Sequence, residues 1–262
     1  MAGSYQNLIR LLFSACAALV AAQGQPPGFG PPGSPPAPRS AAPIDLTGYW
    51  VSLVTEDWRS RMTVPPKGDA ESVPLNPEGR KAAQAWDPAK DESAGDQCKG
   101  YGAGGIVRRP GRMHISWQDD NTLKAEFDAG TQSRIMHFGP PPSQGRDWQG
   151  ISVASWDVPG TIMTRGSFGL GMPVGPERGG ALKVVTTHLK AGYLRRNGIP
   201  YSEDAIITEY YDRFEVPNGS SLLLVTTEIT DPMYLTAPFW TSTHFKKQND
   251  SAGWNPSPCS AK

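Results

Sequence analysis

The sequence has no excess of charge of either sign, and it has few residues of the kinds that form metal or nucleophile sites. Its 262 residues include 25 basic and 25 acidic side chains, 3 cysteines and 4 histidines. Because no net field would attract a polyanion, the composition argues against nucleic acid as a partner. No GxSxG, HExxH or CxxC motif occurs. We therefore expect no nucleophile elbow, no metal site and no cofactor.

The N-terminal 22 residues are typical of an export signal. A basic residue precedes an apolar run over residues 11–22, which is too short to span a membrane, and small residues precede Gln23. We expect a signal peptide over residues 1–22, no membrane span, and a periplasmic or secreted protein. The alternatives are a buried N-terminal helix and a lipid anchor at Cys16, where the apolar residues that follow the cysteine disfavour lipidation.

Two further segments are defined by composition. Residues 23–44 are rich in proline and glycine, which favours extended polyproline II and excludes regular helix or sheet. This segment is predicted to be a disordered linker, either a tether or simply tolerated disorder. The remaining residues, 45–262, are predicted to form a single β-barrel domain, because no repeat or second domain is visible.

Two cysteines, Cys98 and Cys259, remain after the export signal. An even pair in an exported protein indicates one disulfide, which would join the C-terminal tail to the loop around Cys98. Two free thiols are the alternative. Neither cysteine has a second cysteine or a histidine at metal-ligand spacing nearby, so metal binding is not expected.

Beyond residue 45, apolar and polar residues alternate with a period of two, which is typical of strands with one buried face. This pattern predicts an all-β fold, either an antiparallel barrel or a sandwich. One short helix is expected over residues 76–86, because Asn76 can cap it and Pro77 suits its first position. About ten segments read as strands: TGYWVSLV, RMHISWQ, TLKAEFD, SRIMHF, GISVASWDV, TIMTRGSF, ALKVVTTHL, DAIITEYYDRF, SLLLVTTEIT and FWTSTHFK.

The first hairpin has a register that the apolar pattern decides. A three-residue loop over 119–121 pairs Trp117 with Leu123 and keeps one face apolar. The same register places His114 opposite Glu126 on the polar face.

The second hairpin is less constrained. A three-residue loop over 129–131 would pair Glu126 with Arg134 on the outside and place His137 opposite Leu123 on the apolar face. A two-residue loop would bury Arg134 instead, which is costly unless the arginine has a partner. We expect the first of these registers.

Two Asn-Gly dipeptides, Asn197-Gly198 and Asn218-Gly219, are strong hairpin turn signals, and the second predicts a third hairpin. Centring the turn there places Glu209 opposite Glu228. Two close carboxylates can divide the roles of acid and base, because one pKa is pushed above the other. The alternatives are a solvated surface pair bridged by Arg213, or a register shifted by one residue.

Candidate site residues follow from these registers. All four histidines fall in predicted strands, and histidines that point into one barrel interior could act as a general base. A single hydrogen-bonded histidine at each position is the more common outcome. If the protein is an enzyme, the predicted catalytic residues are Glu209, Glu228 and His137. The residues predicted to line a ligand site are Trp117, His137, Tyr211, Arg213 and His244.

Gly48-Tyr49-Trp50 resembles the G-x-W start of lipocalin-type barrels. Longer segments, among them PLNPEGRKAAQAWDPAKD, LKVVTTHLKAGYLRRNGIPYSE and DPMYLTAPF, resemble a widespread family of secreted, β-rich bacterial proteins without an assigned activity. The resemblance covers residues 46–259. It implies export and a barrel-like domain, and it supplies no catalytic residues.

The leading functional hypothesis is an exported protein that binds a small, partly apolar molecule inside a barrel. The first alternative is a barrel enzyme, such as an isomerase, hydratase or lyase, that uses a glutamate or histidine as acid and base. The second alternative is a structural protein of the cell envelope.

Overall fold

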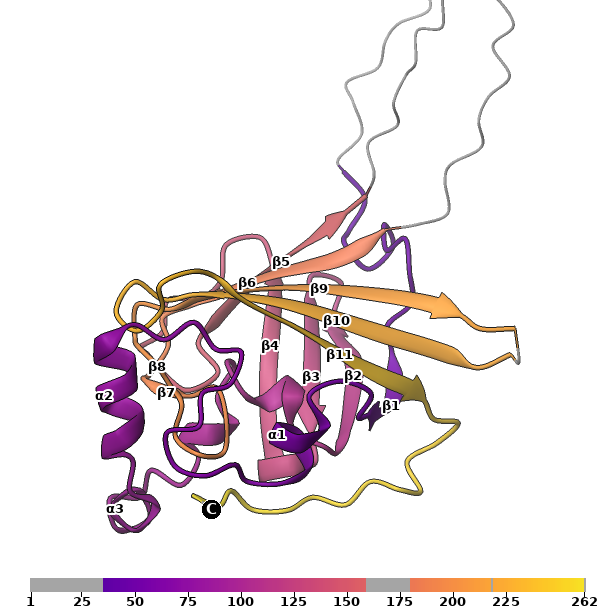
Figure 1. Cartoon of the computed structure of the whole chain (residues 1–262). Helices are drawn as coiled ribbons and strands as arrows, with labels where there is room; N and C mark the ends of the chain where they lie inside the picture. The colour runs from indigo at the N-terminus through magenta and orange to yellow at the C-terminus, as the bar shows by residue number, and fades with distance from the viewer. Residues whose placement is uncertain (1–34, 159–179, 218, 262) are drawn as a thin grey trace, which may run out of the picture. The chain divides into compact units, whose positions relative to one another are not determined.

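Nine strands close into a barrel in the computed structural model, which describes residues 35–158, 180–217 and 219–261. The order around the barrel is β1-β11-β10-β9-β6-β5-β4-β3-β2, as Figure 1 shows. An all-β barrel is therefore confirmed over the sandwich. The strands are β1 (Gly48–Leu53), β2 (Arg112–Asp119), β3 (Thr122–Phe127), β4 (Gln132–Phe138), β5 (Ile151–Asp157), β6 (Ala181–Thr187), β9 (Ile206–Glu215), β10 (Ser221–Thr230) and β11 (Phe239–Lys247).

Alternation along each strand sends one set of side chains inward, where they fill the barrel. These apolar side chains are buried and pack into one cluster. Because side chains rather than solvent occupy this volume, the barrel interior is a core, as in other small barrels. The cluster includes Trp50, Met113, Ile115, Leu123, Met136, Leu182, Tyr211, Leu223, Val225 and Phe245.

Trp50 shows why the G-x-W segment needs its glycine. Gly48 has a φ of 103°, and a Cβ there would lie 2.8 Å from Nζ of Lys247. The same lysine ammonium lies 4.6 Å from the centre of the Trp50 ring, and the indole N–H donates to the carbonyl of Leu46. A cation–π contact and one hydrogen bond thus fix Trp50 where the barrel begins.

The predicted pairing of the first hairpin is confirmed, but its three-residue loop is wrong, because Asp119 pairs with Thr122 and an irregularity between Trp117 and Asp119 keeps the pairing of the earlier residues. Trp117 lies opposite Leu123, and His114 lies opposite Glu126. His114 Nδ1 is 3.2 Å from a Glu126 carboxylate oxygen. The alternation of apolar residues was sufficient here because both strands contribute an uninterrupted apolar face.

The predicted register of the second hairpin is wrong. Leu123 lies opposite Met136, and Glu126 lies opposite Ser133, because four residues rather than three separate β3 and β4. Arg134 consequently points into the barrel instead of pairing with Glu126. His137 shares the outward face with Ser133 rather than the apolar face.

The predicted register of the third hairpin is wrong by one residue. Glu209 lies opposite Thr227, and Glu228 lies opposite Thr208. The two glutamates therefore occupy opposite faces, Glu209 inward and Glu228 outward, and no carboxylate pair forms. The strands are joined by a loop in which Val216 N donates to Ser220 O.

One pairing departs from the antiparallel expectation. β4 and β5 run parallel, with Met136 opposite Ser152. Parallel neighbours need a connection that returns along the sheet. Residues 139–150 provide it.

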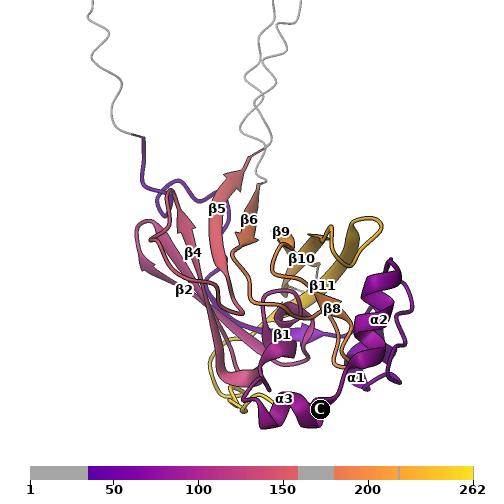
Figure 2. The same cartoon turned by 90° about the vertical axis from the view of Figure 1, so that its left-hand side faces the viewer.

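Short helices and a small hairpin cover one end of the barrel (Figures 1 and 2). The helix expected over residues 76–86 is confirmed as α2 (Pro77–Ala85), where Asn76 Oδ1 accepts from the Gly79 amide at 2.8 Å. The pattern did not predict the other helices: α1 (Trp58–Met62), α3 (Pro88–Ser93), η1 (Lys99–Tyr101), η2 (Ile106–Arg108) and η3 (Ala129–Thr131). The turn signal at Asn197-Gly198 lies in the small hairpin of β7 (Gly192–Tyr193) and β8 (Pro200–Tyr201).

Residues 37–44 were expected in the linker, but the folded unit begins at Ala37 and therefore includes them. The Pro38 carbonyl accepts from the Trp156 indole at 2.8 Å, and the Arg39 amide donates to the Asp120 carbonyl at 3.1 Å. The folded part thus begins before residue 45. The predicted signal peptide and the predicted strand TIMTRGSF lie outside the described residues.

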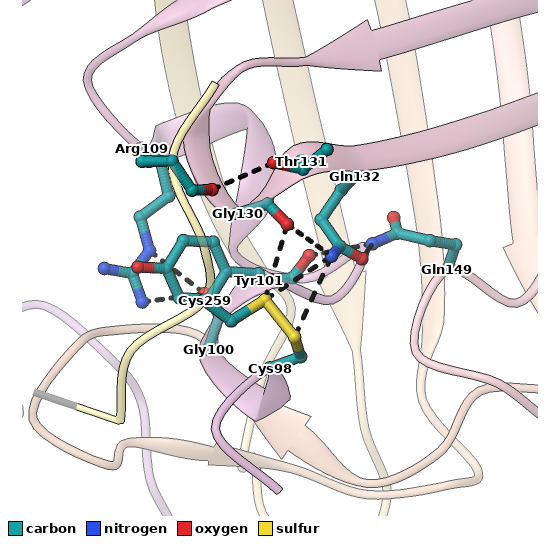
Figure 3. The surroundings of a disulfide bond; sticks show 10 residues. Cys98, Gly100, Tyr101, Arg109, Gly130, Thr131, Gln132, Gln149 and Cys259 are labelled. Atoms are coloured by element: carbon teal, nitrogen blue, oxygen red, sulfur yellow. Dashed lines mark hydrogen bonds between the residues drawn. A yellow bond between two sulfur atoms is a disulfide. The ribbon is translucent and has the colours of Figure 1, made fainter. Parts of the chain in front are cut away.

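The disulfide between Cys98 and Cys259 is confirmed. Figure 3 shows it beside Gly130 and Gln132, at the turn between β3 and β4. The Gln132 side-chain amide donates to the Gly130 carbonyl at 2.8 Å and lies 3.4 Å from Cys259 Sγ. The bond thereby fastens the C-terminal tail and the η1 segment to the barrel wall.

We expect the Cys98→Ser/Cys259→Ser variant to lose roughly 4–5 kcal/mol of unfolding free energy, because the bond closes a separation of 161 residues. Urea unfolding followed by circular dichroism measures this change. The matched control is the oxidised wild type. A difference below about 1 kcal/mol would show that the denatured chain gains little freedom when the bond is removed.

Candidate functional site

Two charged side chains lie inside the barrel and make a bidentate ion pair. Arg134 Nη1 donates to Glu209 Oε1 at 2.9 Å, and Nη2 donates to Oε2 at 2.7 Å. Both side chains are 0% exposed. This paired geometry is the strongest that a guanidinium and a carboxylate can make, and it accounts for the inward position of Arg134.

Two hydroxyl groups extend the pair into a polar layer. Arg134 Nη2 also donates to Thr186 Oγ1 at 3.0 Å, and Thr186 Oγ1 lies 2.8 Å from Ser152 Oγ. Burial lowers the pKa of Arg134, but the Glu209 carboxylate outweighs burial and holds that pKa above its usual value. Burial, and then the Glu209 charge, raise the pKa of Tyr211.

The ion pair separates two apolar clusters. Along β9, Ile207 belongs to the cluster under the helices and Tyr211 to the cluster inside the barrel, with Glu209 between them. No solvent reaches either charged group. The pair therefore has the environment of a structural contact, in which removing one partner leaves an uncompensated buried charge.

The residues predicted to line one ligand site are not brought together. His137 and His244 lie on the outer faces of β4 and β11, and His244 Nδ1 is 3.0 Å from a Glu56 carboxylate oxygen. His188 lies outside the strands, with a φ of 56°. Tyr211 is inside the barrel.

Trp117 and Arg213 have other surroundings. Trp117 packs on Phe138 and Trp156 where β2, β4 and β5 end, with ring centres 5.6 and 6.4 Å away. Arg213 shares the inward face of β9 but lies at its end, half-buried, and donates to the Asp45 carbonyl at 2.8 Å.

A hollow of about 310 Å³ lies outside the barrel, between α2, α3 and the β7–β8 hairpin. Its walls are mainly apolar and aromatic, which is typical of sites for small organic molecules, and its volume is at the lower end of their range. The lining residues are Ala82, Ala85, Trp86, Asp87, Lys90, Asp91, Lys99, Ala191, Gly192, Tyr193, Pro200, Tyr201 and Tyr234.

Three polar side chains meet in this hollow, which we call the helix pocket. Asp91 is buried, and its carboxylate accepts from Tyr193 Oη at 2.7 Å and from Lys99 Nζ at 3.0 Å. Burial and the Asp91 carboxylate raise the pKa of Tyr193. Burial lowers the pKa of Lys99, but hydrogen bonds to Asp96 and Asp91 outweigh it and hold that pKa above its usual value.

The shape of the helix pocket depends on a close approach. Gly198 has a φ of 79°, and a Cβ there would lie 2.0 Å from the Trp86 side chain. Only glycine allows both the turn and this contact. The Asn-Gly turn signal was visible in the sequence, but the contact with a residue 112 positions earlier was not.

Comparisons with known protein families, with characterised proteins and with solved structures found no match. The resemblance to secreted β-rich bacterial proteins therefore stays a prediction. Among the described residues, no group of three or more His, Cys, Asp or Glu side chains is placed to hold a metal ion. No helix in this part of the chain has the length and apolar character needed to cross a membrane.

We expect Arg134→Met or Glu209→Gln alone to lower the unfolding free energy by about 3–5 kcal/mol, because each leaves one buried group without its partner. The double variant Arg134→Met/Glu209→Gln should lose less than the sum of the two single variants, since no buried charge remains. A double-mutant cycle in urea measures the coupling. Single variants within about 1 kcal/mol of wild type would contradict a structural role for the pair.

The raised pKa of Tyr193 gives a pH prediction. The phenol of Tyr193 loses its proton near pH 10 in the unfolded chain and at higher pH in the folded chain. Its contribution to the unfolding free energy is therefore present below about pH 10 and is lost as pH rises above that value. Asp91→Asn removes the neighbouring charge and should lower the pKa of Tyr193. Ultraviolet absorbance measures the formation of phenolate as pH rises. The difference between the wild type and Tyr193→Phe isolates the titration step of Tyr193. An unchanged step in Asp91→Asn would show that the carboxylate does not act on the phenol.

Proposed function

We propose that this protein is exported and binds a small, partly apolar molecule in the helix pocket. The observation that carries the proposal is the combination of apolar walls with the Asp91, Lys99 and Tyr193 cluster in a hollow of about 310 Å³. Apolar walls supply affinity, and a few fixed polar groups orient the ligand. The disulfide supports export, because such bonds persist in oxidising compartments.

The helix pocket is a better candidate than the barrel interior. Packed side chains fill the described interior, and the Arg134–Glu209 pair lies across it. A ligand there would have to displace well-packed apolar groups and disturb a desolvated ion pair. Binding outside the barrel requires neither change.

The two alternatives differ in what supports them. The enzyme alternative relied on a glutamate or His137 inside the barrel, but the register of β9 and β10 separates Glu209 from Glu228, and His137 lies on the outer face of β4. A filled interior favours the structural alternative, because a scaffold has no need of a cavity. The structural role is therefore the second candidate.

The test is binding at the helix pocket with defined probes. We expect a phenol, a phenolic amine or a phenolic carboxylate, namely p-cresol, tyramine or 4-hydroxyphenylacetate, to shift the indole N–H resonance of Trp86 in NMR spectra and to saturate. Native mass spectrometry of the purified protein provides an independent measurement of one bound probe. Tyramine and 4-hydroxyphenylacetate differ in charge, so their order of affinity shows whether Asp91 or Lys99 dominates.

A pair of helix variants provides the control. Ala85 lines the pocket and Ala89 does not, although both are exposed on neighbouring helices. Ala85→Phe should weaken binding at least tenfold by filling the hollow, and Ala89→Phe should not change it. Equal effects of both variants, or no saturable binding of any probe, would favour the structural role.

A further inference from the structure

A second hollow is lined by five arginines and no acidic side chain. It lies between α1, the η2 segment and the turn that joins β7 to β8, and its enclosed volume is about 20 Å³. Its lining residues are Ser60, Arg61, Gly100, Gly105, Arg108, Arg109, Pro110, Leu194, Arg195 and Arg196. We call it the arginine hollow.

Two of the five guanidinium groups have direct carboxylate partners. Arg61 pairs with Glu56, and Arg108 pairs with Asp57. Arg61 Nε also donates to the Arg108 carbonyl at 3.0 Å, which holds the two arginines side by side. These contacts fix one wall of the hollow.

The other three arginines have no such partner. Within the part of the chain that the structure describes, no carboxylate lies within 4.0 Å of Arg109, Arg195 or Arg196. Arg109 lies over the Tyr101 ring at 4.0 Å and donates to the Gly100 carbonyl, as Figure 3 shows. The cluster thus carries more positive charge than its neighbours neutralise.

Several N–H groups in the cluster are buried without an acceptor. Arg61 is only 3% exposed and Arg195 only 8%, yet Nη2 of Arg61 and Nε of Arg195 have no hydrogen-bond partner. Nε of Arg196 is also buried and has no hydrogen-bond partner. Nε of Arg112 and of Arg134, which do not line the hollow, also lack an acceptor, but three such arginines gather around this one space, and that grouping indicates a missing acceptor.

The electrostatics agree with this geometry. Burial and the charge of Arg196 lower the pKa of Arg109 to about 10, although Tyr101 acts in the opposite direction. Burial also lowers the pKa of Arg61 and Arg195, despite the acidic residues nearby. An anion among these groups would favour their charged forms and raise each pKa.

We propose that the arginine hollow is a binding site for an oxyanion, either a free inorganic anion or the phosphate or carboxylate end of a larger molecule. Guanidinium groups offer N–H donors in a planar arrangement that suits phosphate and carboxylate oxygens. The unpartnered N–H groups of Arg61, Arg195 and Arg196 supply the donors.

The size of the hollow limits the ligand. A volume of about 20 Å³ holds roughly one or two oxygen-sized groups, so only the tip of an anion enters. Ser60 and Arg195 also line an adjacent hollow of about 370 Å³, which can take the rest of the molecule. Asp69 and Glu71 line that second space and would repel a polyanion. A compact ligand with one anionic group fits both spaces.

Thermal unfolding of the disulfide-intact chain tests the site at constant ionic strength. We expect inorganic phosphate to raise the midpoint, with a gain in unfolding free energy that grows with the logarithm of the phosphate concentration above Kd, as binding to one site requires. Phenyl phosphate and sodium acetate are the second and third probes. Tighter binding of phenyl phosphate than of inorganic phosphate would identify the end of a larger molecule as the ligand class, and equal binding would identify a free anion.

Two variants separate a site from a general effect of salt. Arg196→Gln, at a half-buried position, should weaken phosphate binding about tenfold, because one charge-assisted contact is lost. Arg146→Gln changes an arginine that pairs with Glu203 and does not line the hollow, and it should leave binding unchanged. The proposal is overturned if phosphate does not raise the midpoint, or if Arg196→Gln responds like wild type.

An NMR readout covers the case in which a variant does not fold. The Nε–H resonances of Arg195 and Arg196 in the wild-type chain should shift on addition of phosphate and exchange more slowly with water, because each gains an acceptor. Unchanged resonances at saturating phosphate would contradict binding in the hollow.

Discussion

The ion pair between Arg134 and Glu209 is the contact around which the barrel interior is arranged. The two side chains come from strands on different parts of the barrel, and each is fully buried. A buried charge is tolerated only with a partner, so the registers of β4 and β9 must both present these residues inward. The same requirement sends His137 and Glu228 outward and leaves the interior to packed apolar side chains.

A closed interior leaves the segments outside the strands to form binding surfaces. The turn between β7 and β8 contributes to both hollows: Tyr193 and Pro200 flank it on the helix pocket, and Arg195 and Arg196 line the arginine hollow. The η1 segment also contributes to both hollows, because Lys99 lines the helix pocket and Gly100 lines the arginine hollow. The disulfide at Cys98 fastens this segment to the barrel wall, so the covalent bond steadies both surfaces. This arrangement agrees with the tendency of proteins to place binding residues on loops held by a rigid scaffold.

Patterns among neighbouring residues predicted the strands and one helix, because these elements depend mainly on residues close in the sequence. Period-two alternation located the nine barrel strands, and Asn76 and Pro77 located α2. The hairpin registers at Arg134 and Glu209 were wrong, because burial of either charged residue is unfavourable until its partner, 75 residues away, is known. The candidate sites were missed for the same reason. The doublets Arg108-Arg109 and Arg195-Arg196 were visible in the sequence, but only the fold brings them to one hollow.

Buried arginines in this protein have two different environments, and the contrast bears on function. Arg134 has a bidentate carboxylate partner and a hydroxyl acceptor, so its charge is compensated within the chain although its Nε has no acceptor. Arg195 is buried almost as fully but has only the Ser72 hydroxyl as a direct acceptor. A folded chain that needed Arg195 only for packing could use an apolar residue with less desolvation cost. The charge of Arg195 is therefore better explained by an acceptor from outside the chain. Arg134, whose charge is paired with Glu209, is the contrasting case.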